Sequence, residues 1–104
     1  MRRYVPEGFT SWATEGVRLR HKVTAVSGGA TTVALTVRHS DLSTSFLTRS
    51  VTSADSAYQW LTINGSALPG WGSGDYIEVE VQLSNASATS NVTVELGRIE
   101  FNWL

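Results

Sequence analysis

The sequence predicts an all-β protein, an antiparallel β-sandwich of roughly seven to eight short strands. Three observations point to this fold class. Thr and Ser number 25 of the 104 residues and Val adds 11, and the β-branched Thr and Val favour strands. Several segments alternate apolar and polar residues, whereas none keeps apolar residues at helical spacing for three turns. Turn residues recur roughly every 8–12 positions, as they do in sandwich domains.

Two alternating segments are expected to form a hairpin. Residues 15–26 and residues 31–38 each place their odd-numbered apolar residues on one face, and a turn at residues 27–30 contains two glycines. The inward residues are Val17, Leu19, His21, Val23, Ala25, Val33, Leu35 and Val37. Because His21 falls on this face, we expect its imidazole to be buried and neutral.

Residues 43–51 are expected to form a third strand, but the sequence leaves its inward face open. Phe46 and Leu47 are adjacent, so both can point inward only if the strand contains a bulge. A polar segment follows, in which Thr52 and Asp55 have the spacing of a capping box. This spacing favours a single helical turn.

The strand expected at residues 57–63 has apolar side chains on both faces. Leu61 and Ile63 belong to one face, and Tyr58 and Trp60 belong to the other. A strand of this kind is covered on both sides, and so small a domain has no second core for the aromatic face. We therefore expect Tyr58 and Trp60 to form a subunit interface in a closed homo-oligomer, with a trimer favoured.

Turns and alternating residues continue through the C-terminal half. Asn64–Gly65 is a two-residue turn signal, and a Gly-rich loop follows at residues 69–75. Residues 76–83 alternate strictly and predict a strand, whereas the polar residues 84–90 predict a turn.

The last predicted strand, residues 92–103, changes phase. Its apolar residues move from even to odd positions: Val92, Val94, Leu96, Ile99, Phe101 and Trp103. One extra residue must be absorbed near Gly97, and a β-bulge does this. We expect Gly97 to take the first position of the bulge with a positive φ, so that Gly97→Val destabilises the fold.

Residues 1–12 do not alternate and are expected to form an arm outside the central core. Pro6 has no N–H, so this stretch can pair only at a sheet edge or not at all. Large apolar side chains and two arginines on such an arm favour attachment to a neighbouring molecule, through Arg2, Arg3, Tyr4, Phe9 and Trp12. The alternative is an arm that closes the end of its own sandwich.

Composition limits the function classes. The length suits a single domain over residues 1–104, and the chain has no Cys, which excludes disulfides, Cys-based zinc sites, iron–sulfur clusters and thiol nucleophiles. A net charge of −1 with 16% charged residues provides no basic field for nucleic acid or anionic lipid, and no apolar run reaches membrane-spanning length. We expect no cofactor, no nucleic-acid partner and no membrane partner.

Charge is divided unevenly along the chain. Residues 1–52 carry seven basic and three acidic side chains, net +4, and residues 53–104 carry one basic and six acidic, net −5. Basic and acidic strands can be sheet neighbours with cross-strand ion pairs, or the domain can be a dipole whose ends attract its own copies or a larger lattice. We favour the paired arrangement.

No pattern indicates an enzyme. In the run His39–Asp41, neighbours on a strand point to opposite faces, so Ser40 cannot serve His39 as a nucleophile. Glu78 and Glu80 share one strand face, which is expected to be a solvated outer surface. No set of His, Asp and Glu has the spacing of a metal site.

Two aromatic residues are the candidate ligand or receptor contacts. Trp71 stands in the Gly-rich loop, and Tyr76 begins the next predicted strand. Exposed Trp and Tyr rings serve as flat stacking platforms for sugars. The alternative is that Trp71 folds back and plugs the open end of the sandwich.

The second half of the chain resembles a known group of proteins. The segments that carry the resemblance are Ala57–Ile63, Leu68–Trp71, Gly74–Val81 and Val94–Trp103, with a weaker match at Trp12–Val17. They resemble the small jelly-roll-like β-sandwiches of tailed-bacteriophage virions: capsid decoration (cement) proteins and head-fibre or tail-fibre type domains. Carbohydrate-binding modules have a similar pattern of strand and turn residues. The resemblance implies a jelly-roll-like sandwich and transfers no catalytic residue.

The resemblance implies a non-enzymatic virion structural protein that decorates or cements a phage capsid or joins the tail. Its expected partners are further copies of itself and the major capsid or tail protein of the same virion, and its expected location is the capsid or tail surface. A chain of 104 residues that begins at Met1 is expected to be a standalone product, as decoration proteins often are. The alternative is a carbohydrate- or host-receptor-binding module with a glycan as its partner.

Overall fold

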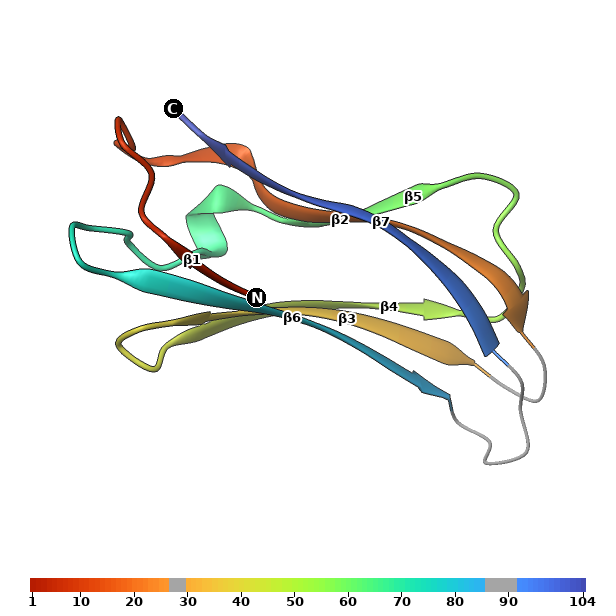
Figure 1. Cartoon of the computed structure of the whole chain (residues 1–104). Helices are drawn as coiled ribbons and strands as arrows, with labels where there is room; N and C mark the ends of the chain where they lie inside the picture. Colours follow the sequence, from red (N-terminus) through yellow and green to blue (C-terminus); the bar gives the residue numbers. More distant parts are fainter. Residues whose placement is uncertain (27–29, 86–91) are drawn as a thin grey trace.

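Two antiparallel sheets face each other, so the predicted all-β sandwich is confirmed (Figure 1). The computed structural model describes residues 1–26, 30–85 and 92–104. Sheet A has four strands in the order β1-β6-β3-β4, and sheet B has three in the order β5-β2-β7. The strands are β1 (Arg2–Tyr4), β2 (Trp12–Val26), β3 (Thr31–His39), β4 (Thr44–Val51), β5 (Gln59–Ile63), β6 (Tyr76–Asn85) and β7 (Val92–Trp103).

β2 and β3 belong to different sheets, so the predicted hairpin between them is wrong. β2 pairs with β5 and β7, whereas β3 pairs with β4 and β6. The alternation that predicted both strands reports which side chains are buried and carries no information about which strand lies alongside. Residues 27–29, where the sequence predicts the turn, and residues 86–91 of the second polar turn lie outside the described residues.

The core between the sheets contains the alternating residues that the sequence predicts, except Ala25, which is exposed because the register of β2 with β7 shifts between Val23 and Ala25. The buried apolar side chains are Val17, Leu19, Val23, Val33, Leu35, Val37, Val51, Leu61, Ile63, Trp71, Ile77 and Val79. His21 is fully buried among them, and burial lowers the pKa of its imidazole, so the ring is neutral as predicted.

β4 is confirmed, and its register with β3 decides the face that the sequence left open. Leu47 lies opposite Leu35, which is fully buried, so Leu47 shares the inward face and Phe46 points outward. The register runs without a shift, so the strand needs no bulge. The connection to β5 contains no helix, and the predicted turn from Thr52 to Asp55 is therefore wrong.

Asn64–Gly65 begins a short 3-10 helix, η1 (Gly65–Ala67), instead of a two-residue turn. The Asn64 side chain caps it by accepting hydrogen bonds from the Ser66 N–H at 2.9 Å and the Ser66 hydroxyl at 2.8 Å. Gly65 is required there, because a Cβ would lie 2.8 Å from Cβ of Trp12. In the described part of the chain no helix is long and apolar enough to cross a membrane.

β7 contains the predicted bulge, but its glycine has a different conformation. Leu19 pairs with Ile99 and His21 pairs with Leu96, so β7 has one more residue than β2 across this step. Gly97 is not among the glycines with positive φ, so that part of the prediction is wrong. Glycine is needed for space, since a Cβ on Gly97 would lie 3.0 Å from the carbonyl oxygen of Arg20 and 3.1 Å from its Cβ.

The N-terminal arm is part of the sandwich, so the expectation that it lies outside the core is wrong. β1 pairs with β6 and forms an edge of sheet A. Phe9 and Trp12 pack against the core. Arg3 lies over the ring of Phe101 at 4.6 Å, and this contact joins the arm to sheet B. The arm thus closes one end of its own fold.

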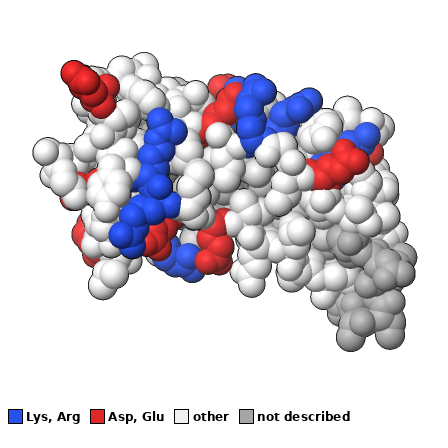
Figure 2. Space-filling view, viewed as in Figure 1, with Lys and Arg blue, Asp and Glu red and all other residues white. Residues whose placement is uncertain are grey.

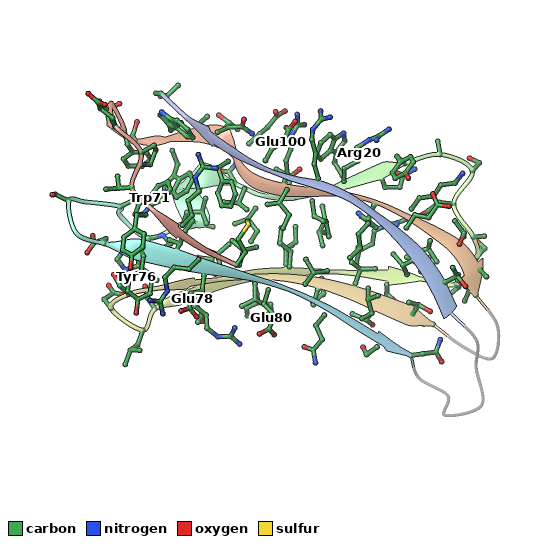
Figure 3. All side chains as sticks on the ribbon, viewed as in Figure 1. Arg20, Trp71, Tyr76, Glu78, Glu80 and Glu100 are labelled. Carbon is green, nitrogen blue, oxygen red and sulfur yellow. The ribbon has the colours of Figure 1, made fainter. Side chains whose placement is uncertain are left out.

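Charged side chains pair across neighbouring strands, as the favoured arrangement predicts. On sheet A, Arg2 lies 2.6 Å from Glu78 and Arg38 lies 3.0 Å from Glu80. On sheet B, Arg18 lies 2.6 Å from Glu100. Figure 2 shows Lys and Arg side chains next to Asp and Glu side chains on the face in view. Glu78 and Glu80 lie on the outer side of sheet A (Figure 3), which confirms the predicted outer surface.

Candidate functional site

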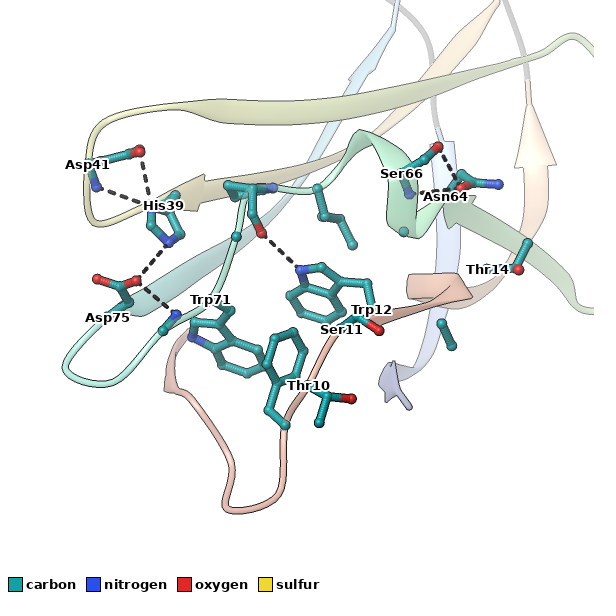
Figure 4. A pocket seen from close by; sticks show the side chains of 17 residues that line it. Thr10, Ser11, Trp12, Thr14, His39, Asp41, Asn64, Ser66, Trp71 and Asp75 are labelled. Carbon is teal, nitrogen blue, oxygen red and sulfur yellow. Dashed lines mark hydrogen bonds and ion pairs between the residues drawn. The ribbon is translucent and has the colours of Figure 1, made fainter.

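A pocket of about 880 Å³ opens at the end of the sandwich where the arm, η1 and the Gly-rich loop meet (Figure 4). Its apolar wall comes from Phe9, Trp12, Leu68 and Trp71. Polar side chains line the remainder: Thr10, Ser11, Thr14, His39, Asp41, Asn64, Ser66 and Asp75.

Three aromatic rings from two distant segments form the pocket wall. Trp12 and Trp71 stack with ring centroids 4.9 Å apart and an interplanar angle of 4°, and Phe9 packs edge-on against both. The Trp12 indole N–H donates to the Pro69 carbonyl at 2.9 Å. Trp71 is only 4% exposed, so it plugs the end of the sandwich, as the alternative interpretation predicts.

Two buried polar atoms of this wall have no hydrogen-bond partner among the described residues: Nε1 of Trp71 and Nε2 of His39. Neither atom has appreciable solvent-accessible surface. A molecule entering the pocket could therefore not reach them without moving the protein.

His39 lies between two carboxylates at the pocket rim. Its Nδ1 is 3.1 Å from Oδ1 of Asp41, and its Nε2 is 3.6 Å from Oδ2 of Asp75. Hydrogen bonds from Ser43, supported by His39, lower the pKa of Asp41 to about 2. The Ser40 hydroxyl lies 3.5 Å from Oδ1 of the same Asp75 carboxylate, and the expectation that Ser40 does not serve His39 as a nucleophile stays a prediction. In the described ranges no cluster of three His, Asp or Glu residues could hold a metal ion.

Trp71 and Tyr76 do not form one exposed platform, which a sugar-binding module would need. Trp71 lies between the sheets, whereas Tyr76 lies on the outer side of sheet A (Figure 3). There Tyr76 packs edge-on against Tyr4 with ring centroids 5.7 Å apart, and the Arg2 guanidinium covers its ring at 4.0 Å.

Arginines of the same chain cover the aromatic face of β5. Arg18 lies 4.0 Å from the ring centroid of Trp60, and Arg20 lies 3.9 Å from that of Tyr58. The Tyr58 hydroxyl donates to Glu95 at 2.9 Å. Because these arginines already shield Tyr58 and Trp60, burial of the two rings does not require a second subunit. The predicted subunit interface at these residues stays a prediction.

Three exposed apolar side chains lie along the free edge at β4, and we call them the apolar strip, although two of them, Phe46 and Leu47, point to opposite faces of sheet A. Leu42, Phe46 and Leu47 are 90%, 70% and 40% exposed. Leu42 projects from the β3–β4 turn with a φ of 73°. The adjacent apolar pair Phe46 and Leu47 was the available signal, because two such neighbours on an edge strand cannot both be covered by one partner sheet.

A comparison of this chain with known protein families, curated proteins and solved structures finds no match.

Proposed function

We propose that this protein is a non-enzymatic structural subunit of a tailed-bacteriophage virion, which decorates or cements the capsid or joins the tail. The observation that carries the proposal is the exposed apolar strip formed by Leu42, Phe46 and Leu47. A subunit that holds its neighbours together works by burying such surface between them, because their separation returns that surface to water.

The attachment of the first and last residues to the fold supports a rigid building block. Val79 donates its N–H to the Met1 carbonyl at 2.7 Å and accepts a hydrogen bond from the Met1 amino group at 3.0 Å. The N–H of Leu104 donates to the Ser11 carbonyl at 2.9 Å. Terminal residues are usually poorly ordered unless they are tied down, so these bonds extend the ordered sandwich to both ends.

Two carboxylates of the pocket hold loop backbone or side-chain groups of the protein itself. A general acid or base acts best with a pKa near the working pH, whereas the pKa of Asp41 is lowered to about 2. Asp75 accepts the Gly72 N–H at 2.9 Å and thereby holds its own loop. The alternative, a carbohydrate- or receptor-binding module, loses support because Trp71 is buried and Tyr76 is covered by Arg2.

Particle fractionation tests the proposal. Virions from a lysate of the source culture are separated on a density gradient and probed with antiserum against the purified protein. We expect the protein to band with capsids or tails and the antibody to label them in electron micrographs. Presence of the protein only among the free proteins of a lysate that contains virions would overturn the proposal.

An add-back experiment identifies the surface. Labelled Phe46→Lys protein is expected to bind stripped particles less than the unmodified protein, because a charge enters the apolar strip. The matched control is Tyr58→Lys, which makes the same exchange on the opposite sheet and is expected to bind as the unmodified protein does.

A further inference from the structure

β4 is a sheet edge without the features by which proteins block strand pairing. It runs for eight residues and keeps an unbroken register with β3. It contains no proline and no bulge, and its one charged side chain, Arg49, is held by Asp55. Long regular edges with exposed apolar side chains are templates for pairing with another chain.

The other edges of the described sandwich are short or protected. β1 has three residues, two of which are arginines, and β5 has five. β7 has register shifts against β2 and carries Glu95, Arg98 and Glu100. Met1 and β1 cover β6 over residues 76–79 and leave residues 81–84 as a shorter free stretch. β4 is therefore the edge most open to pairing.

The hydrogen bonds at the β3–β4 turn define the direction of each backbone group in sheet A. His39 donates its N–H to the Ser43 carbonyl at 2.8 Å, towards β4. Ser40 donates its N–H to the Tyr76 carbonyl at 3.0 Å, towards β6. Because this direction alternates along an antiparallel strand, the odd-numbered residues of β3 bond to β4 and the even-numbered residues bond to β6.

The register transfers this alternation to β4. Leu35 lies opposite Leu47, and Val37 lies opposite Ser45, so the odd-numbered residues of β4 bond back to β3. The even-numbered residues turn their N–H and C=O groups to the free edge: Thr44, Phe46, Thr48 and Ser50.

The outward residues of one β4 can pair with the outward residues of a second β4 when the two strands are centred on Leu47. When two copies of β4 lie antiparallel about a two-fold axis at Leu47, Phe46 faces Thr48 of the second copy and Thr44 faces Ser50 of the second copy. Each facing pair exchanges two hydrogen bonds, and none of these pairs brings like charges together. The two Leu47 side chains meet at the axis on the inward face.

From this geometry we propose that the protein forms a two-fold dimer in which sheet A of one copy continues through β4 into sheet A of the other. The dimer satisfies the free backbone groups of β4 and covers Phe46 and Leu47. A two-fold contact uses the same patch on both copies, so the assembly closes at two. This dimer rests on the proposed function and identifies a second copy of the chain as one neighbour of the subunit. It differs from the trimer that the sequence predicts at Tyr58 and Trp60.

Sedimentation velocity of the purified full chain tests the dimer. We expect a species of about twice 11.3 kDa at micromolar concentration. Phe46→Lys is expected to give monomers, because it places one positive charge from each copy close to the axis. Tyr58→Lys and Leu83→Lys are the matched controls, directly before β5 and on the free stretch of β6, and both are expected to remain dimeric. A monomer or trimer of the unmodified protein, or a dimer that survives Phe46→Lys, overturns the proposal.

Cross-linking tests the register, since the chain has no Cys and a single introduced thiol can only link two copies. At the axis the two Cα atoms form a non-hydrogen-bonded pair about 4.5 Å apart, within disulfide range. Leu47→Cys is therefore expected to cross-link readily with oxidised glutathione. Phe46→Cys is the control, because its two Cα atoms lie about 8 Å apart by strand spacing and rise, beyond that range. Equal cross-linking of the two variants overturns the register.

Failure of the dimer and failure of the virion role are distinguishable. A monomeric protein that is found on particles overturns the dimer and leaves the virion role standing. A dimeric protein that is absent from particles supports the dimer and overturns the virion role.

Discussion

Arg49 on β4 and Asp55 before β5 form a two-pronged ion pair that ties sheet A to sheet B. Nη1 of Arg49 lies 2.9 Å from Oδ2 of Asp55, and Nη2 lies 2.5 Å from Oδ1. The same Oδ2 accepts the N–H of Val23 in β2 at 2.9 Å. Arg49 also donates to Nε2 of His21 at 3.0 Å, which requires that the proton of the neutral ring sits on Nδ1 and faces the Leu19 carbonyl at 3.3 Å.

Asp55→Asn is expected to destabilise the protein strongly. Breaking a buried ion pair costs about 3–5 kcal/mol, and the partial exposure of Arg49 reduces the expected loss to about 2–3 kcal/mol. Urea denaturation measures the free energy of unfolding. The control is Glu80→Gln at the Arg38–Glu80 pair, whose side chains are about half exposed at 47% and 51%. Its expected loss is below about 1 kcal/mol. Equal losses at the two sites would contradict the bridging role of Asp55.

Stability is expected to fall with acid in two stages. Burial lowers the pKa of folded His21 below 6.5, so the unfolded chain takes up the proton first and stability is lost as the pH falls below 6.5. Hydrogen bonds from Arg49 lower the pKa of Asp55 from 3.8 to about 2, so its contribution is lost as the pH falls through that window. Melting temperatures across the pH range show both stages, and His21→Gln is expected to remove the first. If the loss of stability below pH 6.5 persists in His21→Gln, protonation of His21 is not its cause.

Gly97→Val is expected to destabilise the protein because an added side chain would press tightly against Arg20 of β2. Its Cβ would meet the backbone oxygen of Arg20 at 3.0 Å. Forcing additional atoms into such a contact costs about 1–3 kcal/mol. The control is Gly70→Ala, where no atom lies within 4 Å of the added Cβ, and its effect is expected to stay within about 0.5 kcal/mol. An unchanged melting temperature for Gly97→Val would contradict the requirement for glycine at the bulge.

Deletion of residues 1–8 is expected to destabilise the isolated protein, since it removes β1 and the Arg3 contact with Phe101. We expect the melting temperature to fall by at least about 5 °C, because each kcal/mol corresponds to about 4–8 °C in a domain of this size. Arg2→Gln is the control, because it keeps the strand and removes only the exposed Arg2 contacts with Glu78 and the Tyr76 ring. A truncated protein with full stability would restore the interpretation of the arm as a free attachment element.

Local pattern was sufficient for the features that depend on one strand at a time. Alternation predicted the inward faces of β3 and β6, and that of β2 as far as Val23, because a strand buried on one face repeats with a period of two. The phase change in the last strand predicted the extra residue near Gly97. The position of His21 between apolar neighbours predicted its burial, and the opposite charge of the two halves predicted the cross-strand ion pairs.

The candidate site depended on contacts between distant segments, which no local pattern reports. Trp71 is buried because the arm brings Phe9 and Trp12 against it. Trp60 is covered because β2 places Arg18 over its ring. A short stretch of sequence shows that a large apolar side chain must be buried. It does not show which distant residue buries it.

The sequence by itself therefore determined the all-β class, the inward faces of β3 and β6 and the bulge in β7. The tertiary structure alone decided that β2 and β3 lie in different sheets and that Phe46 lies on an uncovered edge. The physical reason is that side-chain alternation measures burial along one strand, whereas the choice of neighbouring strand depends on how all the strands close around one core.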